Sequence, residues 1–400
     1  MLLKNVREKT PTLLTAVLFL LIPLDYVLPH FGNATVVTMI SIIMIFYGAF
    51  YISRRRKIHI SQNMVSLVFL LIVFCISYFW AINKNVVLSR FVSVTNTVLL
   101  YCTVVQFRFE KEAIEFVENA SILGAMILVV WVYKNIDLDL VYAGYRLRFS
   151  QLGSEYFSDP NGLAGRIIFP FVIILNRAFY NQGKRKGLLL LYGTLIIVFT
   201  YILLLTGSRA GLIAIAIAAI LFSKQSFENK KSWVTIGIIV IIVLFYLLAP
   251  HFLPQHIIER LFSVGKYKEV TELEGDRIDI WKHIINELFF SSPLFGYGGG
   301  CSAYALSQFY GHLKAVHNSY LIVLCETGLL GFIPWMYFII KQIRDAVLFH
   351  KNSTALLSAT IAVLFIAMTL DAFTEKYFWS IFFYIYIIKY CFVEESKEKP

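Results

Sequence analysis

Three basic residues in this sequence combine a chemically useful side chain with a notable position: Arg209, Arg277 and His317. A guanidinium is always charged, and its planar fork binds two oxygens of a phosphate at once. Arg209 and Arg277 are therefore candidates for holding a diphosphate from two sides. An imidazole titrates close to neutral pH and can take a proton from a hydroxyl, which makes His317 a candidate general base.

Each of the three also has a simpler interpretation. Arg209 could snorkel to lipid headgroups, although the small residues of its turn, TGSRAGL, would let a ligand approach the backbone. Arg277 could be a solvated charge neutralised by Asp276 and Asp279. His317 could be an interfacial histidine. A metal site is disfavoured, because no carboxylate or second histidine lies at i+4 from His317 and no cysteine pair has metal spacing. No cofactor is expected.

Five further residues are candidates for a donor or acceptor pocket. The segment SDPNGLAGR contributes Asp159, Asn161 and Arg166, and the segment that begins with HNSY contributes Asn318 and Glu326. Charged groups at membrane depth are costly and tend to mark a site, which favours Arg166. Asn318 could orient the neighbouring histidine or bind sugar. Asp159 and Asn161 equally suit a turn and helix cap in which the intervening proline takes the first helical position.

Glycines surround these candidates. Gly328 and Gly331 follow Glu326 closely and predict tight packing between helices. The segment GYGGG at 296–300 resembles a phosphate-binding loop only superficially, because no Lys-Ser/Thr follows it and no strand precedes it. A nucleotide site is therefore not expected.

The elements that must position these residues are predicted to be membrane helices. The 400-residue chain is 58% hydrophobic and 15% charged, whereas soluble domains carry roughly 25% charged residues. Its apolar runs approach the roughly 20 residues needed to cross about 30 Å of hydrocarbon, and such runs must be helical in lipid. We expect one polytopic, all-α integral membrane domain over residues 1–400. Twelve spans are predicted, at about 12–29, 34–52, 64–81, 91–107, 114–133, 162–180, 188–205, 210–223, 233–250, 317–340, 354–371 and 377–393.

The basic residues predict the orientation of this domain. Most of the 36 Lys and Arg residues fall in segments that share one side if the N-terminus is cytoplasmic. The positive-inside bias then places both termini in the cytoplasm. Because these charges are spread over seven segments, the net charge of +11 does not indicate nucleic-acid binding.

With this orientation the polar motifs gather on the outer face. The segments SDPNGLAGR, TGSRAGL, HNSY and DAFTEK all open there, and residues 251–316, between spans nine and ten, form a large extracytoplasmic loop. Loops of that length are usually functional or disordered. This one contains an amphipathic helix at about 276–290, whose expected apolar stripe is Trp281, Ile284, Ile285 and Leu288.

The motifs resemble those of a known family. His317-Asn318, nine residues and then Gly328-Leu-Leu-Gly331 resemble the His-Asn-x9-Gly-x-x-Gly pattern of the O-antigen ligase/polymerase superfamily. The segment GDRIDIW…SSPLFGYGGG ahead of this pattern, the Ser-Arg-Ala-Gly turn at 208–211 and the DPNGLA element also resemble that family. The resemblance covers residues 155–345 in motifs and the whole chain in architecture.

The resemblance implies a metal-independent glycosyltransferase that uses a polyprenyl-diphosphate-linked oligosaccharide on the outer face of the cytoplasmic membrane. By resemblance, Arg209 and Arg277 would hold the diphosphate and His317 would activate the acceptor hydroxyl. The favoured function is polymerase of a surface polysaccharide, such as O-antigen or capsule, with membrane lipids and a chain-length regulator as partners. The alternatives are an O-antigen ligase, which transfers glycan to lipid A core or protein, and a flippase without catalysis.

Overall fold

The computed structural model describes residues 2–25, 27–31, 34–135, 160–180, 186–228, 251, 253, 255–262 and 272–398. Apart from one short hairpin, all regular structure in these ranges is helical. The hairpin pairs β1 (His30–Phe31) with β2 (Ala34–Thr35) in antiparallel register. The predicted all-α class is therefore confirmed for the described part of the chain.

The main bundle is built from helices that coincide with eleven of the twelve predicted spans, and the remaining span, 233–250, lies outside the described residues. The bundle helices are α1 (Leu2–Leu21), continued by η1 (Ile22–Leu24), α2 (Val36–Arg55), α3 (Gln62–Ile76), continued by η2 (Ser77–Phe79), α4 (Lys84–Val104), α5 (Glu112–Asn135), α7 (Pro160–Tyr180), α8 (Lys186–Leu205), α9 (Arg209–Glu228), α15 (Ser319–Phe349), α16 (Thr354–Ala367) and α17 (Lys376–Glu398).

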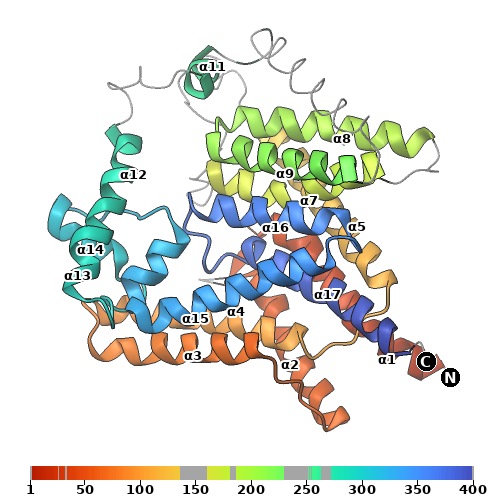
Figure 1. The fold of residues 1–400 in the computed structure, drawn as a ribbon, viewed down its shortest axis with the longest axis horizontal. Coiled ribbons are helices and arrows are strands. Elements are labelled where there is room, and N and C mark those ends of the chain that lie inside the picture. Colours follow the sequence, from red (N-terminus) through yellow and green to blue (C-terminus); the bar gives the residue numbers. More distant parts are fainter. Residues whose placement is uncertain are drawn as a thin grey trace.

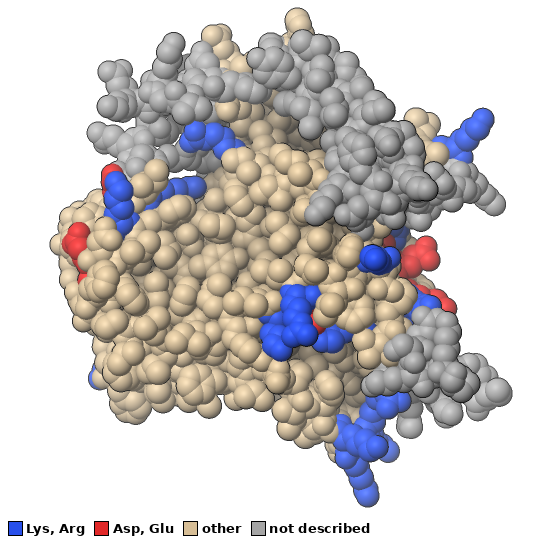
Figure 2. Space-filling model, in the orientation of Figure 1, with Lys and Arg blue, Asp and Glu red and all other residues tan. Residues whose placement is uncertain are grey.

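The bundle has the character of a multi-pass membrane protein. Among the described residues, seven helices are long and apolar enough to cross a membrane, and three shorter apolar helices accompany them. Large apolar side chains such as Phe46, Leu190 and Ile197 stay more than two thirds exposed, as expected where the surrounding solvent is lipid. Figure 2 shows a broad uncharged face on which Lys and Arg form a few clusters.

Several helix starts follow from local capping chemistry. Thr35, Ser61, Asn83 and Asn318 precede α2, α3, α4 and α15, and each accepts a hydrogen bond from a backbone N–H of the first turn. A short polar side chain at this position satisfies donors that the helix cannot. In α4 this cap lies eight residues before the predicted span, because hydropathy marks only where a helix becomes apolar.

The predicted outer loop contains α11 (Gln255–Phe262), α12 (Glu272–His283), the π-helical turn η3 (Ile284–Leu288), α13 (Phe289–Ser291) and α14 (Ser302–Tyr310). Ile257 of α11 belongs to the core of the bundle, whereas α12 to α14 form a helical subdomain beside it, the outer subdomain. In Figure 1, α12 to α14 lie at the left end of the molecule and both chain termini lie at the right. The extracytoplasmic placement of residues 251–316 stays a prediction.

The predicted amphipathic stripe is partly wrong. Ile284 and Leu288 are buried against α14 and α15, and Trp281 is partly buried, but Ile285 is 46% exposed. Ile280 takes its place in the buried cluster. The π-helical turn carries more residues per turn than an α-helix, so residues four apart keep one face and Ile285 rotates away.

A break in α15 shapes the site described below. Gly328 has φ +57° and ψ −160° within an otherwise helical segment, a conformation essentially restricted to glycine. The segment 293–298 bonds to the backbone groups around the break. Tyr297 N and Gly298 N donate to Cys325 O and Glu326 O, while Leu329 N and Leu330 N donate to Pro293 O and Leu294 O.

The glycines therefore serve different purposes from those expected. Gly331 packs closely as predicted, because a Cβ there would lie 3.2 Å from Leu70 of α3. Gly328 instead provides a backbone conformation. The glycines of GYGGG are also structural: a Cβ at Gly298 or Gly299 would collide with Ala81 or Phe74. The segment 293–300, here named the plug, thus bonds to the backbone groups that the broken helix leaves free.

We expect Gly328→Ala to destabilise the protein by at least about 2 kcal/mol, because a Cβ would add strain at positive φ and would lie 2.4 Å from the carbonyl of Leu294. Thermal unfolding of the purified protein in detergent measures this loss. Gly193→Ala in α8 is the matched control, since nothing lies within 4 Å of its added Cβ. Equal melting temperatures for the two variants would contradict the assignment of Gly328 as a required break.

Candidate functional site

His317 lies directly before α15 with φ +51°. This left-handed conformation is uncommon outside glycine, and such residues cluster at functional sites. Its neighbours hold it on both sides. Trp281 of α12 donates from its indole to Val316 O at 3.0 Å, and Asn318 begins the helix. The imidazole is therefore presented from a rigid corner between the outer subdomain and the bundle.

Asn318 has a structural task. Its side-chain oxygen accepts from Tyr320 N at 3.0 Å and from Leu321 N at 3.1 Å, and the residue is buried. This N-cap satisfies the free donors of the first turn of α15. Asn318 thus orients His317 through the backbone, which is one of the two roles expected for it.

Ser319 connects the start of α15 to the turn between α16 and α17. Its hydroxyl donates to Leu370 O at 2.7 Å and accepts from Ala372 N at 2.8 Å. The same turn contains Asp371 and Glu375, which reach toward arginines of other helices. The HNSY segment and the DAFTEK segment therefore lie side by side, although about 50 residues separate them in the sequence.

Arg166 of α7 bonds to the other end of this turn. Its Nη2 lies 3.2 Å from Glu375 Oε2, and its guanidinium lies 5.0 Å from the centre of the Tyr377 ring. The side chain is buried. Arg166 is thus anchored by a carboxylate and an aromatic face, so its first role is to join α7 to the turn before α17.

The start of α7 also contacts the start of α9. Pro160 is the first residue of α7, as predicted. Asn161, the second, is buried and accepts a hydrogen bond of 2.7 Å from the hydroxyl of Ser208. Asp159 lies outside the described residues. The PNG and TGSR turns are therefore held together by one buried bond.

Arg209 occupies the first turn of α9 and is exposed. The preceding Ser208 caps this helix, because its hydroxyl accepts from Gly211 N at 3.1 Å. The first turn contains no acidic residue. A helix N-terminus carries a partial positive charge and binds anions. A guanidinium added at this position makes the corner doubly attractive to a phosphate.

Arg277 lies on α12, one helical turn before Trp281. Trp281 of the same helix donates a hydrogen bond to Val316 O, and Val316 directly precedes His317. The Nε of Arg277 is buried and has no hydrogen-bond partner among the described residues. A guanidinium nitrogen can donate a charge-assisted hydrogen bond to a phosphate oxygen.

Arg90 is a buried arginine of this region that the sequence reasoning missed. Its Nε lies 3.3 Å from Glu326 Oε2 and its Nη2 lies 3.3 Å from Asp371 Oδ1. Its Nη1 donates to Thr374 Oγ1 at 3.4 Å. Arg90 therefore joins α4 to the first half of α15 and to the turn before α17. Arg90 directly precedes the predicted span 91–107, so hydropathy alone does not show that it is buried within α4.

Glu326 is committed to this cluster. It is buried, pairs with Arg90, and accepts from the hydroxyl of Ser302 at 3.0 Å. Because both carboxylate oxygens have partners, Glu326 is a positioning residue that links α15 to α4 and α14.

Arg90→Met should lower the free energy of unfolding by about 3–5 kcal/mol, because it leaves the buried Glu326 without its countercharge. Thermal unfolding in detergent gives the measurement. The double variant Arg90→Met/Glu326→Met is expected to lose less than the sum of the single changes.

Lys282→Met provides the comparison, since Lys282 pairs with Asp279 at 3.0 Å on the exposed surface. Exposed pairs contribute about 0–1 kcal/mol. If Arg90→Met and Lys282→Met lowered stability equally, Arg90 would not be a buried connector.

The geometry thus links four polar segments that are distant in the sequence. Bonds run from Ser208 to Asn161, from Arg166 to Glu375, and from Ala372 to Ser319 beside His317. Arg209 and His317 flank two ends of this series, and Arg277 joins through α12. Such a cluster combines fixed cations with one imidazole, which suits transfer of a group from a diphosphate to a hydroxyl.

One family of known proteins resembles part of this chain. A protein-family model described as O-Antigen ligase matches residues 194–336. The matched segment runs from within α8 through the outer subdomain to the second half of α15, and it contains Arg209, Arg277 and His317. A search of curated proteins finds no match.

Proposed function

We propose that this chain, whose residues 194–336 match the O-Antigen ligase family model, polymerises a surface polysaccharide such as O-antigen or capsule. The donor is a glycan on a polyprenyl diphosphate, and the acceptor is a lipid-linked repeat unit on the outer face of the cytoplasmic membrane. The observation that best supports this proposal is the left-handed His317 at the head of a broken helix. Buried bonds of the neighbouring Ser319 tie this helix start to the turn before α17.

In the proposed reaction His317 takes the proton of the acceptor hydroxyl. The acceptor oxygen then bonds to the anomeric carbon of the donor sugar, and the bond between that carbon and the diphosphate oxygen breaks. The electron pair leaves with the polyprenyl diphosphate. The family resemblance implies that the anomeric configuration inverts.

The departing charge defines the roles of the cations. In this proposal Arg209 and the N-terminus of α9 stabilise the diphosphate from one side, and Arg277 of α12 stabilises it from the other. Preorganised cations in a site with restricted water stabilise such a charge more than they would in bulk water. Two arginines suffice for this role in principle, so we propose that the transfer is metal-independent.

The buried residues around the site act by positioning. Asn161, Asn318, Arg166 and Glu326 hold the turns and the start of α15, as their contacts show. Small displacements of a reacting group cost large factors in rate. We therefore assign these four residues to the geometry of the pocket and the three exposed or half-buried basic residues to its chemistry.

The family description favours a second candidate, an O-antigen ligase that transfers finished glycan to lipid A core or to protein. Deleting the gene and separating the surface glycans on a gel distinguishes the candidates. A polymerase mutant should retain single repeat units. A ligase mutant should accumulate full-length polymer on its lipid carrier. Repeat units trapped on the cytoplasmic face would instead indicate a flippase and overturn the proposal.

The proposed sidedness can be tested by cysteine labelling in a background without the native cysteines. A membrane-impermeant maleimide applied to intact spheroplasts should label His312→Cys, which is exposed after α14, and not Lys351→Cys, which is exposed between α15 and α16. Lys351→Cys should react only after permeabilisation. The reverse pattern would place the candidate site in the cytosol.

Cys301 offers an internal check on that experiment. Its side chain is fully buried, and burial raises the pKa of its thiol above the ordinary value. Since the thiolate is the reactive form, restoring Cys301 alone should give no labelling on either side. Rapid labelling of Cys301 at neutral pH would mean that the plug 293–300 opens readily.

A further inference from the structure

A cavity lies at the opposite end of the bundle from the outer subdomain. It has a volume of about 480 Å³ and lies between the end of α2, the loop that follows it, the end of α4 and the last turns of α17. Both chain termini lie toward this end (Figure 1). The cavity shares no residue with the candidate catalytic site.

The lining of this cavity is basic. Arg55, Lys57, His59, Arg108 and Lys389 contribute to it, and its lining contains no Asp or Glu. Lys389 is neutralised by Asp345 at 2.7 Å. For Arg55, Lys57 and Arg108, no carboxylate lies within ion-pair distance in the part of the chain that the structure describes. Among the described side chains, these three cations of the lining thus have no carboxylate partner.

Helix ends reduce this charge but do not cancel it. The C-termini of α2 and α4 point here, and each contributes roughly −0.5 of an elementary charge. Three full positive charges against two such ends leave a net charge of about +2. The cavity contains more basic residues than are needed to neutralise the two helix ends. The remaining positive charge is complementary to the negative charge of a phosphate group.

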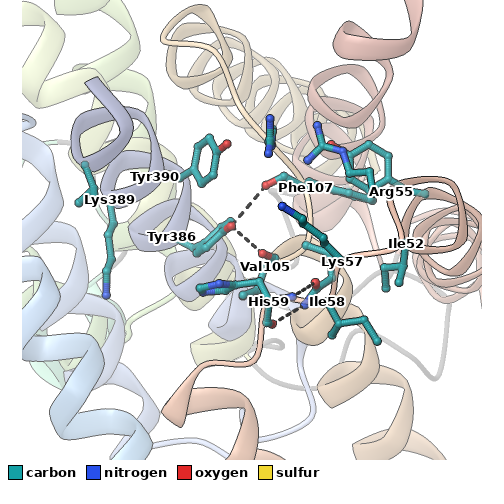
Figure 3. A pocket seen from close by; sticks show the side chains of 14 residues that line it. Ile52, Arg55, Lys57, Ile58, His59, Val105, Phe107, Tyr386, Lys389 and Tyr390 are labelled. Atoms are coloured by element: carbon teal, nitrogen blue, oxygen red, sulfur yellow. Dashed lines mark hydrogen bonds between the residues drawn. The ribbon is translucent and has the colours of Figure 1, made fainter. Parts of the chain in front are cut away.

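The walls of the cavity are held in place by bonds between segments distant in sequence. His59 N donates to the side chain of Gln106 at 2.8 Å, and Gln106 returns a bond of 2.8 Å to His59 O. The hydroxyl of Tyr386 donates to Val105 O at 2.6 Å. Figure 3 shows Arg55 and Lys57 facing Tyr386 and Tyr390 across the opening. The site is therefore built before any ligand arrives.

An aromatic ring restrains one of the three cations, Arg55. The guanidinium of Arg55 lies 4.6 Å from the centre of the Tyr51 ring, and that ring packs edge-on against Phe107 at 5.4 Å. Such stacking limits the motion of Arg55 and leaves its nitrogens free to point elsewhere. A preorganised cation binds an anion with less loss of entropy.

The surroundings of the cavity favour a lipid as the source of the anion. The loop after α2 carries Ile58 and Ile60, which are 63% and 71% exposed. Apolar side chains exposed at the end of membrane helices are suited to the depth where acyl chains meet headgroups. Basic pockets between membrane helices on the cytoplasmic side are suited to anionic headgroups.

From these observations we propose that the cavity between α2, α4 and α17 binds the phosphate of an anionic phospholipid headgroup from the leaflet opposite the candidate catalytic site. Lys57, Arg55 and Arg108 hold the phosphate, and the tyrosines bound the headgroup. The inference does not depend on the proposed glycan transfer. It predicts a lipid retained by the protein on purification and needed for its full stability.

The test uses the full-length protein in a neutral detergent, titrated separately with phosphatidylglycerol, phosphatidylcholine and inorganic phosphate. Lipid binding is read by native mass spectrometry and by the shift of the melting temperature. The variant is Lys57→Gln/Arg108→Gln, which changes two exposed side chains. The control is Arg54→Gln/Lys351→Gln, which removes two exposed charges outside the cavity.

We expect wild type and control to bind phosphatidylglycerol in preference to phosphatidylcholine, and the variant to bind it roughly 30-fold more weakly, since each cation near a headgroup contributes on the order of fivefold. Lys57→Gln alone should lose roughly fivefold by the same reasoning and serves if the double variant is unstable. Equal losses in variant and control would overturn the site. Saturation by inorganic phosphate without preference for phosphatidylglycerol would overturn the lipid as its ligand.

Discussion

Replacing His317 by Asn is expected to abolish glycan transfer while the protein still folds and inserts. Asn cannot accept the proton of the acceptor hydroxyl, and loss of a general base typically costs about 10²–10⁴ in rate. Asn also tolerates the left-handed backbone that His317 adopts at φ +51°. The substitution therefore removes the chemistry with little strain. The rate of elongation of a lipid-linked repeat unit by the purified protein measures the effect.

The control for this experiment is His312→Asn, which changes an exposed histidine five residues earlier. It should leave both the rate and the melting temperature unchanged. His317→Ala should lose activity and also some stability, because Ala tolerates positive φ less well. Polymer of normal length and rate from His317→Asn would exclude the base role.

Arg209→Lys is expected to reduce transfer by about 10²-fold, comparable to the loss of one preorganised donor at a developing negative charge. Lysine retains the charge, but a single ammonium cannot fork onto two oxygens of a diphosphate. Its position in the first turn of α9, exposed and after the Ser208 cap, means that the fold should not change. Single-turnover rates with a polyprenyl-diphosphate donor provide the measurement.

Arg54→Lys at the other end of the bundle is the matched control, since it makes the same exchange at an exposed site. A binding assay with inorganic diphosphate adds a second readout, because loss of the fork should weaken affinity as well as rate. Wild-type rates and affinity for Arg209→Lys would rule out a diphosphate clamp at this helix end.

Much of the architecture follows from local sequence. Runs of apolar residues mark eleven helices of the bundle, and the Asn and Ser caps mark several of their starts. The family motifs can also be recognised from the sequence. The order and spacing of Ser208-Arg209, Arg277 and His317-Asn318 are visible without knowing which residues are in contact. For these features each residue is constrained mainly by its neighbours in the chain.

Other features depend on contacts between distant residues. Arg90 pairs with Glu326, 236 positions away. Arg177, within the predicted span 162–180, is buried and pairs with Glu118 at 2.8 Å. Hydropathy treats each charged residue as a cost at its own position. It contains no information on which opposite charge a different helix will bring, so these buried pairs were missed.

Gly328 shows the same difference between what the sequence predicts and what the tertiary structure adds. The sequence placed Gly328 in a helix and predicted close packing, which an isolated glycine suggests. The break exists because the segment 293–298 supplies bonds to the carbonyls and amides that it frees. A helix can be interrupted inside a membrane protein only where another part of the chain satisfies its backbone.

The sequence alone thus determined the class of protein, most helical segments, the family resemblance and the basic residues of the proposed chemistry, because hydropathy and motif spacing are local properties. The tertiary structure decided how those residues are held: His317 in a strained turn between two subdomains, Glu326 committed to Arg90, and a basic cavity assembled from α2, α4 and α17. Burial and charge pairing depend on which segments meet, and that information exists only in three dimensions.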